Sequence, residues 1–265
     1  DLGHFKEAEI YQRKAIALDP DFVNAHLNLG NILRDLGKLK EAESSYRKAI
    51  ALKPDFVNAY SNLGNILRDL GHFKEAEIYQ RKAIALNPSF VNAYLNLGNI
   101  LRDLGNLKEA ESSYRKAIAL NPNFAMAYSN LGIILSDIGN LKEAEICQRK
   151  AIALNPDFVA AHHCLGDLLN EIGNLREGFD SYLKVIEINP SFHKIYPSIT
   201  RFLQDSDLSK LNKSKLKNIL TIFLKRNDVS HKELFTVFHF LYRDKILSIN
   251  EPIDKEFVKS ESIIN

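Results

Sequence analysis

Asparagine is the residue type whose placement in this sequence most clearly suggests chemistry, because it recurs at fixed spacing in three consecutive segments. Counting from Val23, Val57 and Val91, each segment has asparagine at positions two, six and nine and aspartate at position thirteen. With the arginine before each aspartate, the residues are Asn24, Asn28, Asn31, Arg34, Asp35, Asn58, Asn62, Asn65, Arg68, Asp69, Asn92, Asn96, Asn99, Arg102 and Asp103. A carboxamide has one acceptor and two donors, so it bonds the N–H and C=O of a peptide whatever that peptide's side chains are. This pattern predicts a site for polypeptide backbone.

Only a helix brings these positions together. Steps of four, three and four residues nearly close on full helical turns, so positions two, six, nine and thirteen share one face. We call this face the asparagine stripe. In the next segment only Asn130 keeps the amide, beside Met126, Ile133 and Asp137, and the fifth segment has none. We therefore expect binding to weaken toward the C-terminus.

The segments are copies of a 34-residue repeat. A half unit spans residues 1–22, and five full units span residues 23–56, 57–90, 91–124, 125–158 and 159–192. Each full unit has glycine at positions eight and fifteen and proline at position thirty-two. A longer period is also present, because "IYQRKAI" alternates with "SSYRKAI". The duplicated block was therefore a pair of units.

Each unit reads as two helices, A and B, and the half unit as helix B alone. Asp21, or its counterpart after the proline of each unit, is suited to cap helix A, and the glycine at position fifteen permits a left-handed terminus. Asn106 and Glu109 have the spacing of a capping box for helix B. Glycine at position eight, with alanine at positions twenty and twenty-seven, lets the two helices approach closely. A larger residue at position eight should push the hairpin open.

The pattern resembles the tetratricopeptide repeat family. In the second full unit the matching residues are Tyr60, Leu63, Gly64, Leu67, Ala76 and Pro88. The resemblance implies an all-α, right-handed α-solenoid, a superhelix of antiparallel helix hairpins with a concave helix A surface. The asparagines at position six are also similar to those lining the superhelix of the O-linked N-acetylglucosamine transferase family. That likeness covers the repeats only and implies an extended polypeptide held in the groove.

Three functions follow as expectations. The first is a scaffold that binds an extended segment of a partner protein in the helix A groove. The second is a substrate-recruiting arm of a larger transferase, with its catalytic domain beyond Asn265. The third is a spacer in which the asparagines are solvated residues multiplied by tandem copying. Helix A carries no lysine in the repeats, so a receptor for chaperone C-termini is not expected.

Catalytic and cofactor sites are not expected within this chain. All 12 glycines are accounted for by repeat positions, Gly3 and Gly178, which leaves none for a phosphate-binding loop. His162, His163 and Cys164 are consecutive, and neighbours on a helix point about 100° apart, which disfavours a shared metal ion. We therefore expect no enzyme activity, no metal, no cofactor and no small-molecule substrate.

Residues 193–246 are predicted to form degenerate capping helices, and residues 247–265 a tail or linker. Two helices are expected near 209–226 and 231–246, the second opened by a capping box of Ser230 and Glu233. An apolar face of Leu234, Phe235, Phe238, Leu241 and Tyr242 would close the end of the solenoid. Residues 208–226 contain six basic side chains and no acidic one, which we interpret as a solvated face of the cap.

Charge and composition disfavour other partners. The formal net charge is only +2, so nucleic acid and membrane surfaces are not expected as partners. Two cysteines make no disulfide framework, which favours a reducing compartment and a cytoplasmic location.

Overall fold

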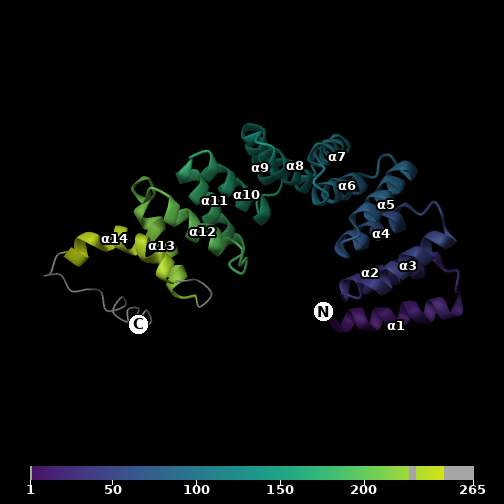
Figure 1. Ribbon diagram of the computed structural model, residues 1–265. Helices are drawn as coiled ribbons and strands as arrows, with labels where there is room; N and C mark the ends of the chain where they lie inside the picture. Colours follow the sequence, from purple (N-terminus) through teal and green to yellow (C-terminus); the bar gives the residue numbers. More distant parts are fainter. Residues whose placement is uncertain (1, 227–230, 248–265) are drawn as a thin grey trace. The chain divides into compact units, whose positions relative to one another are not determined.

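The computed structural model describes residues 2–226 and 231–247, and every regular element in these two ranges is a helix (Figure 1). The α-helices are α1 (Leu2–Leu18), α2 (Val23–Asp35), α3 (Leu39–Leu52), α4 (Val57–Asp69), α5 (Phe73–Leu86), α6 (Val91–Asp103), α7 (Leu107–Leu120), α8 (Ala125–Asp137), α9 (Leu141–Leu154), α10 (Val159–Glu171), α11 (Leu175–Ile188), α12 (Ile195–Asp205), α13 (Lys213–Leu224) and α14 (Phe235–Leu247). The chain divides into two compact units, residues 1–138 and 139–265.

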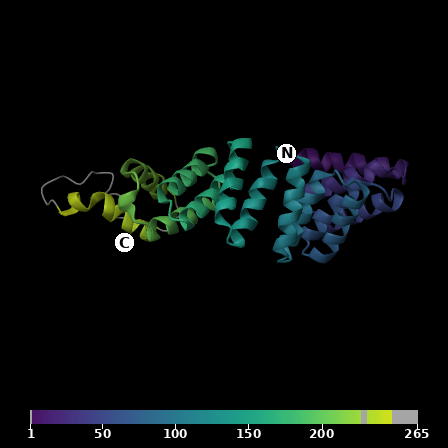
Figure 2. The same cartoon turned by 90° about the horizontal axis from the view of Figure 1, so that it is seen from above.

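The first unit is a stack of helix hairpins (Figures 1 and 2). α2 packs on α3, α4 on α5 and α6 on α7, and each second helix of a hairpin then packs on the first helix of the next. Helices α2, α4, α6 and α8 also contact one another in succession. They are the helices A of this unit, and α1, α3, α5 and α7 are its helices B.

Apolar residues at helical spacing form a core that neighbouring hairpins share. One cluster combines Leu33 and Tyr46 of the α2–α3 hairpin with Ile66 and Leu67 of α4 and Ile100 of α6. All five are at most 1% exposed. A single hairpin leaves this face uncovered, so each repeat is stabilised mainly by its neighbours.

The glycines at position fifteen end helices A as predicted. Gly37 has φ +74°, its N–H donates to the Arg34 carbonyl at 2.9 Å, and the N–H of Lys38 donates to the Leu33 carbonyl at 2.8 Å. This pair of bonds is the Schellman motif. It requires a left-handed backbone conformation, which glycine adopts without strain.

The predicted side-chain caps are wrong. Helix α2 begins after Phe22, and neither this helix nor α7 receives a hydrogen bond from the side chain at its N-cap, Phe22 or Asn106. A side chain instead accepts a backbone hydrogen bond in the turn before the helix, where the N–H of Asp21 donates to Asp19 Oδ1 at 3.1 Å. The asparagines at the equivalent positions 87, 121, 155 and 189 accept the same bond. The residue before the proline therefore closes the turn, which leaves the residue after it without a capping role.

Glycine at position eight lies against a side chain at position twenty-four. A methyl group on Gly98 would stand 2.5 Å from Cε1 of the Tyr114 ring, and Gly30 and Tyr46 have the same arrangement. Gly64 instead faces the Gln80 amide, at 2.8 Å. The glycine makes room for a buried side chain of helix B, in addition to bringing the two backbones together.

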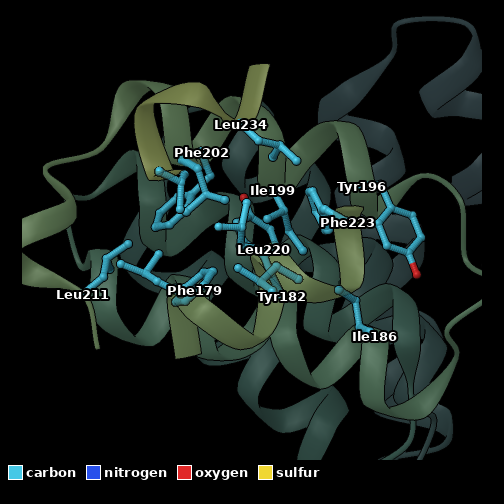
Figure 3. Close-up of a cluster of buried hydrophobic side chains, with 14 of the residues drawn as sticks. Phe179, Tyr182, Ile186, Tyr196, Ile199, Phe202, Leu211, Leu220, Phe223 and Leu234 are labelled. Atoms are coloured by element: carbon cyan, nitrogen blue, oxygen red, sulfur yellow. The ribbon is translucent and has the colours of Figure 1, made fainter. Parts of the chain in front are cut away.

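The second unit contains α9, the α10–α11 hairpin and a C-terminal helical cap, and Figure 3 shows the core of this cap. Phe179 of α11 stacks on Phe202 of α12 with ring centroids 5.6 Å apart, and Phe223 of α13 meets Tyr196 of α12 at 5.4 Å. Leu234 joins the same cluster (Figure 3). The cap covers the apolar face of the last hairpin.

Details of the cap differ from the prediction. The helix expected over 209–226 is divided into a 3-10 turn at Leu208–Lys210 and α13, because Asn212 caps α13 by accepting from the Lys215 N–H at 3.1 Å. The helix expected over 231–246 begins as a 3-10 turn at His231–Leu234 and continues as α14. Phe235 is 67% exposed, whereas Val237 is buried. Ser230 and the predicted tail from 248 onward lie outside the described residues.

Candidate functional site

The asparagine stripe lies on helices A of the first unit, and its positions differ in exposure. Asparagines at position two are exposed in all three helices, and those at position nine are half-buried. At position six Asn28 is exposed, whereas Asn62, Asn96 and Asn130 are half-buried against the preceding helix A. Apart from Asn28, the asparagines at positions six and nine are therefore packed against neighbouring side chains, whereas those at position two lie in solvent.

Buried tyrosines of helix B orient the asparagines at position nine. The Tyr46 hydroxyl donates to Asn31 Oδ1 at 2.8 Å, and the Tyr114 hydroxyl donates to Asn99 Oδ1 at 2.8 Å. Both tyrosines are 0% exposed, and burial raises the pKa of each to about 12. The phenols stay neutral at physiological pH and keep the amide oxygens facing into the hairpin.

Asparagines at position six link one repeat to the preceding one. Asn62 Nδ2 donates to Asn31 Oδ1 at 2.9 Å, and Asn130 Nδ2 donates to Asn99 Oδ1 at 2.9 Å. The oxygens of Asn31 and Asn99 thus accept two bonds each, which uses both lone pairs. We call each contact between one repeat and the next a junction. At these two junctions, one buried phenol fixes two neighbouring amides.

The intervening junction is built differently. Gln80 takes the place of the tyrosine, and its Nε2 donates to Asn65 Oδ1 at 3.0 Å and to the Ser61 carbonyl at 2.8 Å. Asn96 Nδ2 reaches Ser61 Oγ at 3.3 Å. The longer period of the sequence therefore appears in the structure as two alternating ways of holding the stripe.

These bonds leave a defined set of groups for a ligand. Among the described residues, no partner bonds Nδ2 of Asn31 or Asn99, and none bonds Oδ1 of Asn62. Asn58 makes no side-chain hydrogen bond within the same part of the chain. The stripe thus presents donors at position nine and an acceptor at position six, which are the complements of a peptide C=O and N–H.

Charged residues flank the stripe and pair with one another. Arg68 Nε bonds Asp103 Oδ2 of the next helix A at 2.5 Å, and Arg34 bonds Asp35 of its own helix at 2.8 Å. Arg102 lies 4.0 Å from Asp103. Asp35 and Asp103 at position thirteen therefore form ion pairs with the predicted arginines, beside the amides, whereas Asp69 has no ion pair among the described residues.

The second unit does not continue the stripe. Asp167 stands at position nine of α10, and its Oδ1 accepts from the Tyr182 hydroxyl at 2.7 Å. Burial and the Asp167 carboxylate together raise the pKa of Tyr182. His163 packs edge-on against Phe192 at 5.7 Å and its Nε2 bonds Ser198 Oγ at 2.9 Å. This histidine connects α10 to α12, and no group of three metal-ligating side chains occurs among the described residues.

Several basic side chains of residues 208–226 pair or stack with residues of the cap and of α11. Lys215 bonds Asp180 of α11 at 2.5 Å, and the Arg226 guanidinium lies 3.7 Å above the centre of the Tyr196 ring. Lys213 lies 5.7 Å from the Phe240 ring centre. None of the helices in the described ranges is both long and apolar enough to cross a membrane.

The sequence prediction missed the residues that hold the stripe, which are Tyr46, Gln80 and Tyr114 at position twenty-four and Ser61 at position five. Their signal was the alternation of "SSYRKAI" with "IYQRKAI", which places tyrosine and glutamine in turn at position twenty-four. The alternation was visible, but its link to the asparagines depends on packing across the hairpin.

Family models agree with this architecture. Models described as tetratricopeptide repeat match residues 11–44, 57–90, 91–124 and 113–146, and a model described as TPR repeat matches residues 30–71. Together they cover residues 11–146 without a gap, just over half of the 265-residue chain. The comparison with curated proteins returns no match.

Solved structures share the fold. YrrB, described as a TPR protein with an unusual peptide-binding site, is 24% identical, with a TM-score of 0.54 over 71% of this chain and 97% of YrrB. TTC0263, a thermophilic TPR protein of Thermus thermophilus, is 23% identical, with a TM-score of 0.59 over 68% of this chain and 98% of its own. A chain of the APC/C hetero-tetramer Cut9-Hcn1 is 16% identical, with a TM-score of 0.70 over 91% of this chain and 46% of its own.

Repeats of this kind are typical of scaffolds that bind other proteins. The 34-residue period, the stacked helix hairpins and the matching models together show that this chain belongs to the tetratricopeptide repeat family.

Proposed function

We propose that this scaffold binds an extended segment of a partner polypeptide along the asparagine stripe of α2, α4, α6 and α8. The observation that carries the proposal is the pre-ordered set of amides at the repeat junctions. The Tyr46–Asn31–Asn62 chain of bonds fixes two carboxamides before any ligand arrives. Groups held in place in this way lose little freedom on binding, so more of their interaction energy contributes to affinity.

The spacing of the stripe suits an extended chain. Packed helices lie about 8 to 10 Å apart, which is close to the length of three extended residues. Successive helices A are in contact, so each would present its amides once per such interval. The ligand's backbone would be bonded at regular points, with little dependence on its side chains.

The exposed asparagines argue against a purely structural role. Internal bonds explain the choice of Asn31, Asn62, Asn99 and Asn130 at their positions. Position two is different, because its asparagines are exposed and make no side-chain hydrogen bond within the described residues. Asparagine is a mediocre helix former there, so an unliganded spacer gains nothing from it.

The test uses peptides selected for binding from a displayed library of random 16-residue sequences. Two variants are compared with the wild type: Asn24→Ala/Asn58→Ala/Asn92→Ala, which leaves the internal bonds intact, and Asn28→Ala/Asn62→Ala/Asn96→Ala. The matched control is Lys40→Ala/Lys74→Ala/Lys108→Ala, which alters exposed residues of helices B. Circular dichroism reports folding, and fluorescence anisotropy gives the Kd.

We expect the position-six variant to bind at least tenfold more weakly, a loss of about 1.4 kcal/mol or more. The position-two variant should show a smaller loss, and the lysine control should bind like the wild type. Selected peptides that bind both asparagine variants within twofold of the wild type would refute the proposal.

A further inference from the structure

A hollow opens on the helix B side of the first unit, away from the asparagine stripe. It has a volume of about 490 Å³ and lies between α5 and α7, over residues of α6. Ile84, Tyr94 and Leu97 give it apolar surface, and Arg81 lies at its rim with the serines Ser112 and Ser113. The volume is within the range of small-ligand pockets.

One repeat earlier, the same place is filled by a side chain of the protein itself. Tyr79 of α5 lies between helices there, with its ring 6.0 Å from the Tyr60 ring and 5.5 Å from the Arg47 guanidinium. The Tyr79 hydroxyl accepts a hydrogen bond from Arg47 Nη1 at 2.7 Å. At this junction Tyr79 is thus held by a neighbouring tilted ring and by an arginine.

The linings of the two junctions differ at two positions only. Each of the nine residues lining the hollow has a counterpart 34 positions earlier, and seven of the nine pairs are identical in type. The exceptions are Ser112 and Ser113, where Ile78 and Tyr79 stand in the filled junction. The hollow therefore corresponds to the space that the Tyr79 side chain occupies at the preceding junction, whereas Ile78 beside it is 66% exposed.

The arginine at the hollow already has the geometry of the filled junction. Arg81 Nε bonds Glu77 at 2.7 Å and its Nη2 bonds Glu109 at 2.8 Å, as Arg47 Nε bonds Glu43 at 2.9 Å and its Nη2 bonds Glu75 at 2.7 Å. Arg47 Nη1 donates to the tyrosine. Arg81 Nη1 has no partner among the described residues, so the donor that holds the internal tyrosine is available at the hollow.

We propose that the hollow between α5 and α7 binds a tyrosine side chain of a partner protein, in the place that Tyr79 occupies at the preceding junction. The partner's ring packs on Tyr94 and beneath Arg81, and its hydroxyl accepts from Arg81 Nη1. This site shares no residue with the asparagine stripe. The inference is therefore independent of the function proposed above.

The second unit contains the same feature 68 residues later. A hollow of about 410 Å³ there includes Arg149, Leu165 and Ser181, which correspond to Arg81, Leu97 and Ser113. His162 replaces the tyrosine ring, and its Nε2 lies 2.8 Å from the Pro156 carbonyl oxygen. Open junctions thus recur with the longer period of the sequence. In this one, however, Arg149 Nη1 bonds Glu177 Oε1 at 2.6 Å, so the donor that is available at the first hollow is taken at the second.

The test is a titration of the full chain with N-acetyltyrosinamide, followed by methyl NMR. Ile84 reports the first hollow, and Ile152, its counterpart in α9, reports the second. Ser112→Ile/Ser113→Tyr converts the open junction into a copy of the filled one. The reciprocal variant Ile78→Ser/Tyr79→Ser opens the filled junction, where Ile50 is the corresponding reporter.

We expect saturable shifts at Ile84 in the wild type and weaker saturation at Ile152, because Arg149 Nη1 is bonded to Glu177. At Ile84, N-acetylphenylalaninamide should bind about fivefold more weakly because it lacks the hydroxyl. Ser112→Ile/Ser113→Tyr should lose the Ile84 shift and keep the Ile152 shift. Ile78→Ser/Tyr79→Ser should gain a shift at Ile50, which tests the inference even where the first variant fails to fold. An Ile84 shift unchanged by Ser112→Ile/Ser113→Tyr, no shift at Ile84 in the wild type, or equal shifts with N-acetylleucinamide would overturn the proposal.

Discussion

Removing the Tyr114 hydroxyl should change both the stability and the alkaline titration of the protein. In the structure this hydroxyl is fully buried and donates to Asn99 Oδ1 at 2.8 Å. Tyr114→Phe therefore loses one hydrogen bond and leaves an amide oxygen with one partner fewer, at a cost of about 1 kcal/mol at neutral pH.

The pH dependence has a definite sign. Burial raises the pKa of Tyr114 to about 12, above the value of about 10 expected in the unfolded chain. A raised pKa means that folding favours the neutral phenol, so this stability is fully present below about pH 10 and is lost as the pH rises through 12. Near pH 11.5 the wild type should have lost about 2 kcal/mol through this group. Tyr114→Phe cannot lose it, so the order of stability of the two proteins should reverse.

Two assays check this reasoning. The difference between the ultraviolet phenolate titrations of wild type and Tyr114→Phe should show a group titrating near 12. Urea unfolding at about pH 9 and about pH 11.5 should show the reversal. A phenolate that titrates near 10, or a variant that stays less stable at both pH values, would contradict the burial and bonding assigned to Tyr114.

Three further substitutions test the packing of the glycines, and a fourth tests the cap. Gly98→Ala should destabilise the protein by about 1 to 3 kcal/mol in urea unfolding, because the new methyl group meets the Tyr114 ring, and a cost near zero would contradict this. Gly64→Ala should cost less, about 1 kcal/mol, because the unbranched Gln80 side chain yields more easily than a ring, at the expense of its bonds to Asn65 and Ser61; an equal cost at both sites would show that the ring is not the obstacle. Gly71→Ala, at φ +82° with open space around it, should cost about 1 kcal/mol in thermal unfolding through backbone strain alone. Phe223→Ala should remove about 3 to 5 kcal/mol from the cap, and circular dichroism melting should then show the second unit unfolding before the first.

Much of the fold was predictable from the sequence because the repeat supplies the same local signals many times. The end of helix A requires a residue in the left-handed conformation at position fifteen, and glycine there signals it in every repeat. The structure has positive φ at Gly37, Gly71 and Gly105. The small residue at position eight predicted a close approach. The sequence did not reveal that the Tyr46 ring fills the space beside Gly30, because the position of the ring depends on how far helix B is rotated about its axis.

The caps show a second limit of local reasoning. Asp21 has the residue type of an N-cap and lies near the start of α2, yet the helix begins after Phe22. Asp19, on the other side of the proline, closes the same turn. Residue type alone did not distinguish these two solutions, because both satisfy a backbone N–H near the proline.

The asparagine stripe was predictable as a pattern, and its internal bonds were not. Helical spacing places Asn62 beside Asn58, but the bond from Asn62 to Asn31 depends on the distance between two helices A. The alternation of Tyr46 with Gln80 signalled that successive junctions differ. Only the packing shows that the difference reaches the amides.

If the stripe bonds the backbone of a polypeptide, as proposed, replacing backbone amides of the bound peptide by esters should weaken binding. In a selected peptide, single esters would be introduced along the chain, and each Kd would be measured with the wild type and with Asn62→Ala. We expect at least one ester to weaken binding to the wild type about fivefold or more and to have little further effect with Asn62→Ala, because the lost peptide N–H was the partner of Asn62 Oδ1. Esters that cost nothing at any position, or that cost the same in both proteins, would contradict this proposal.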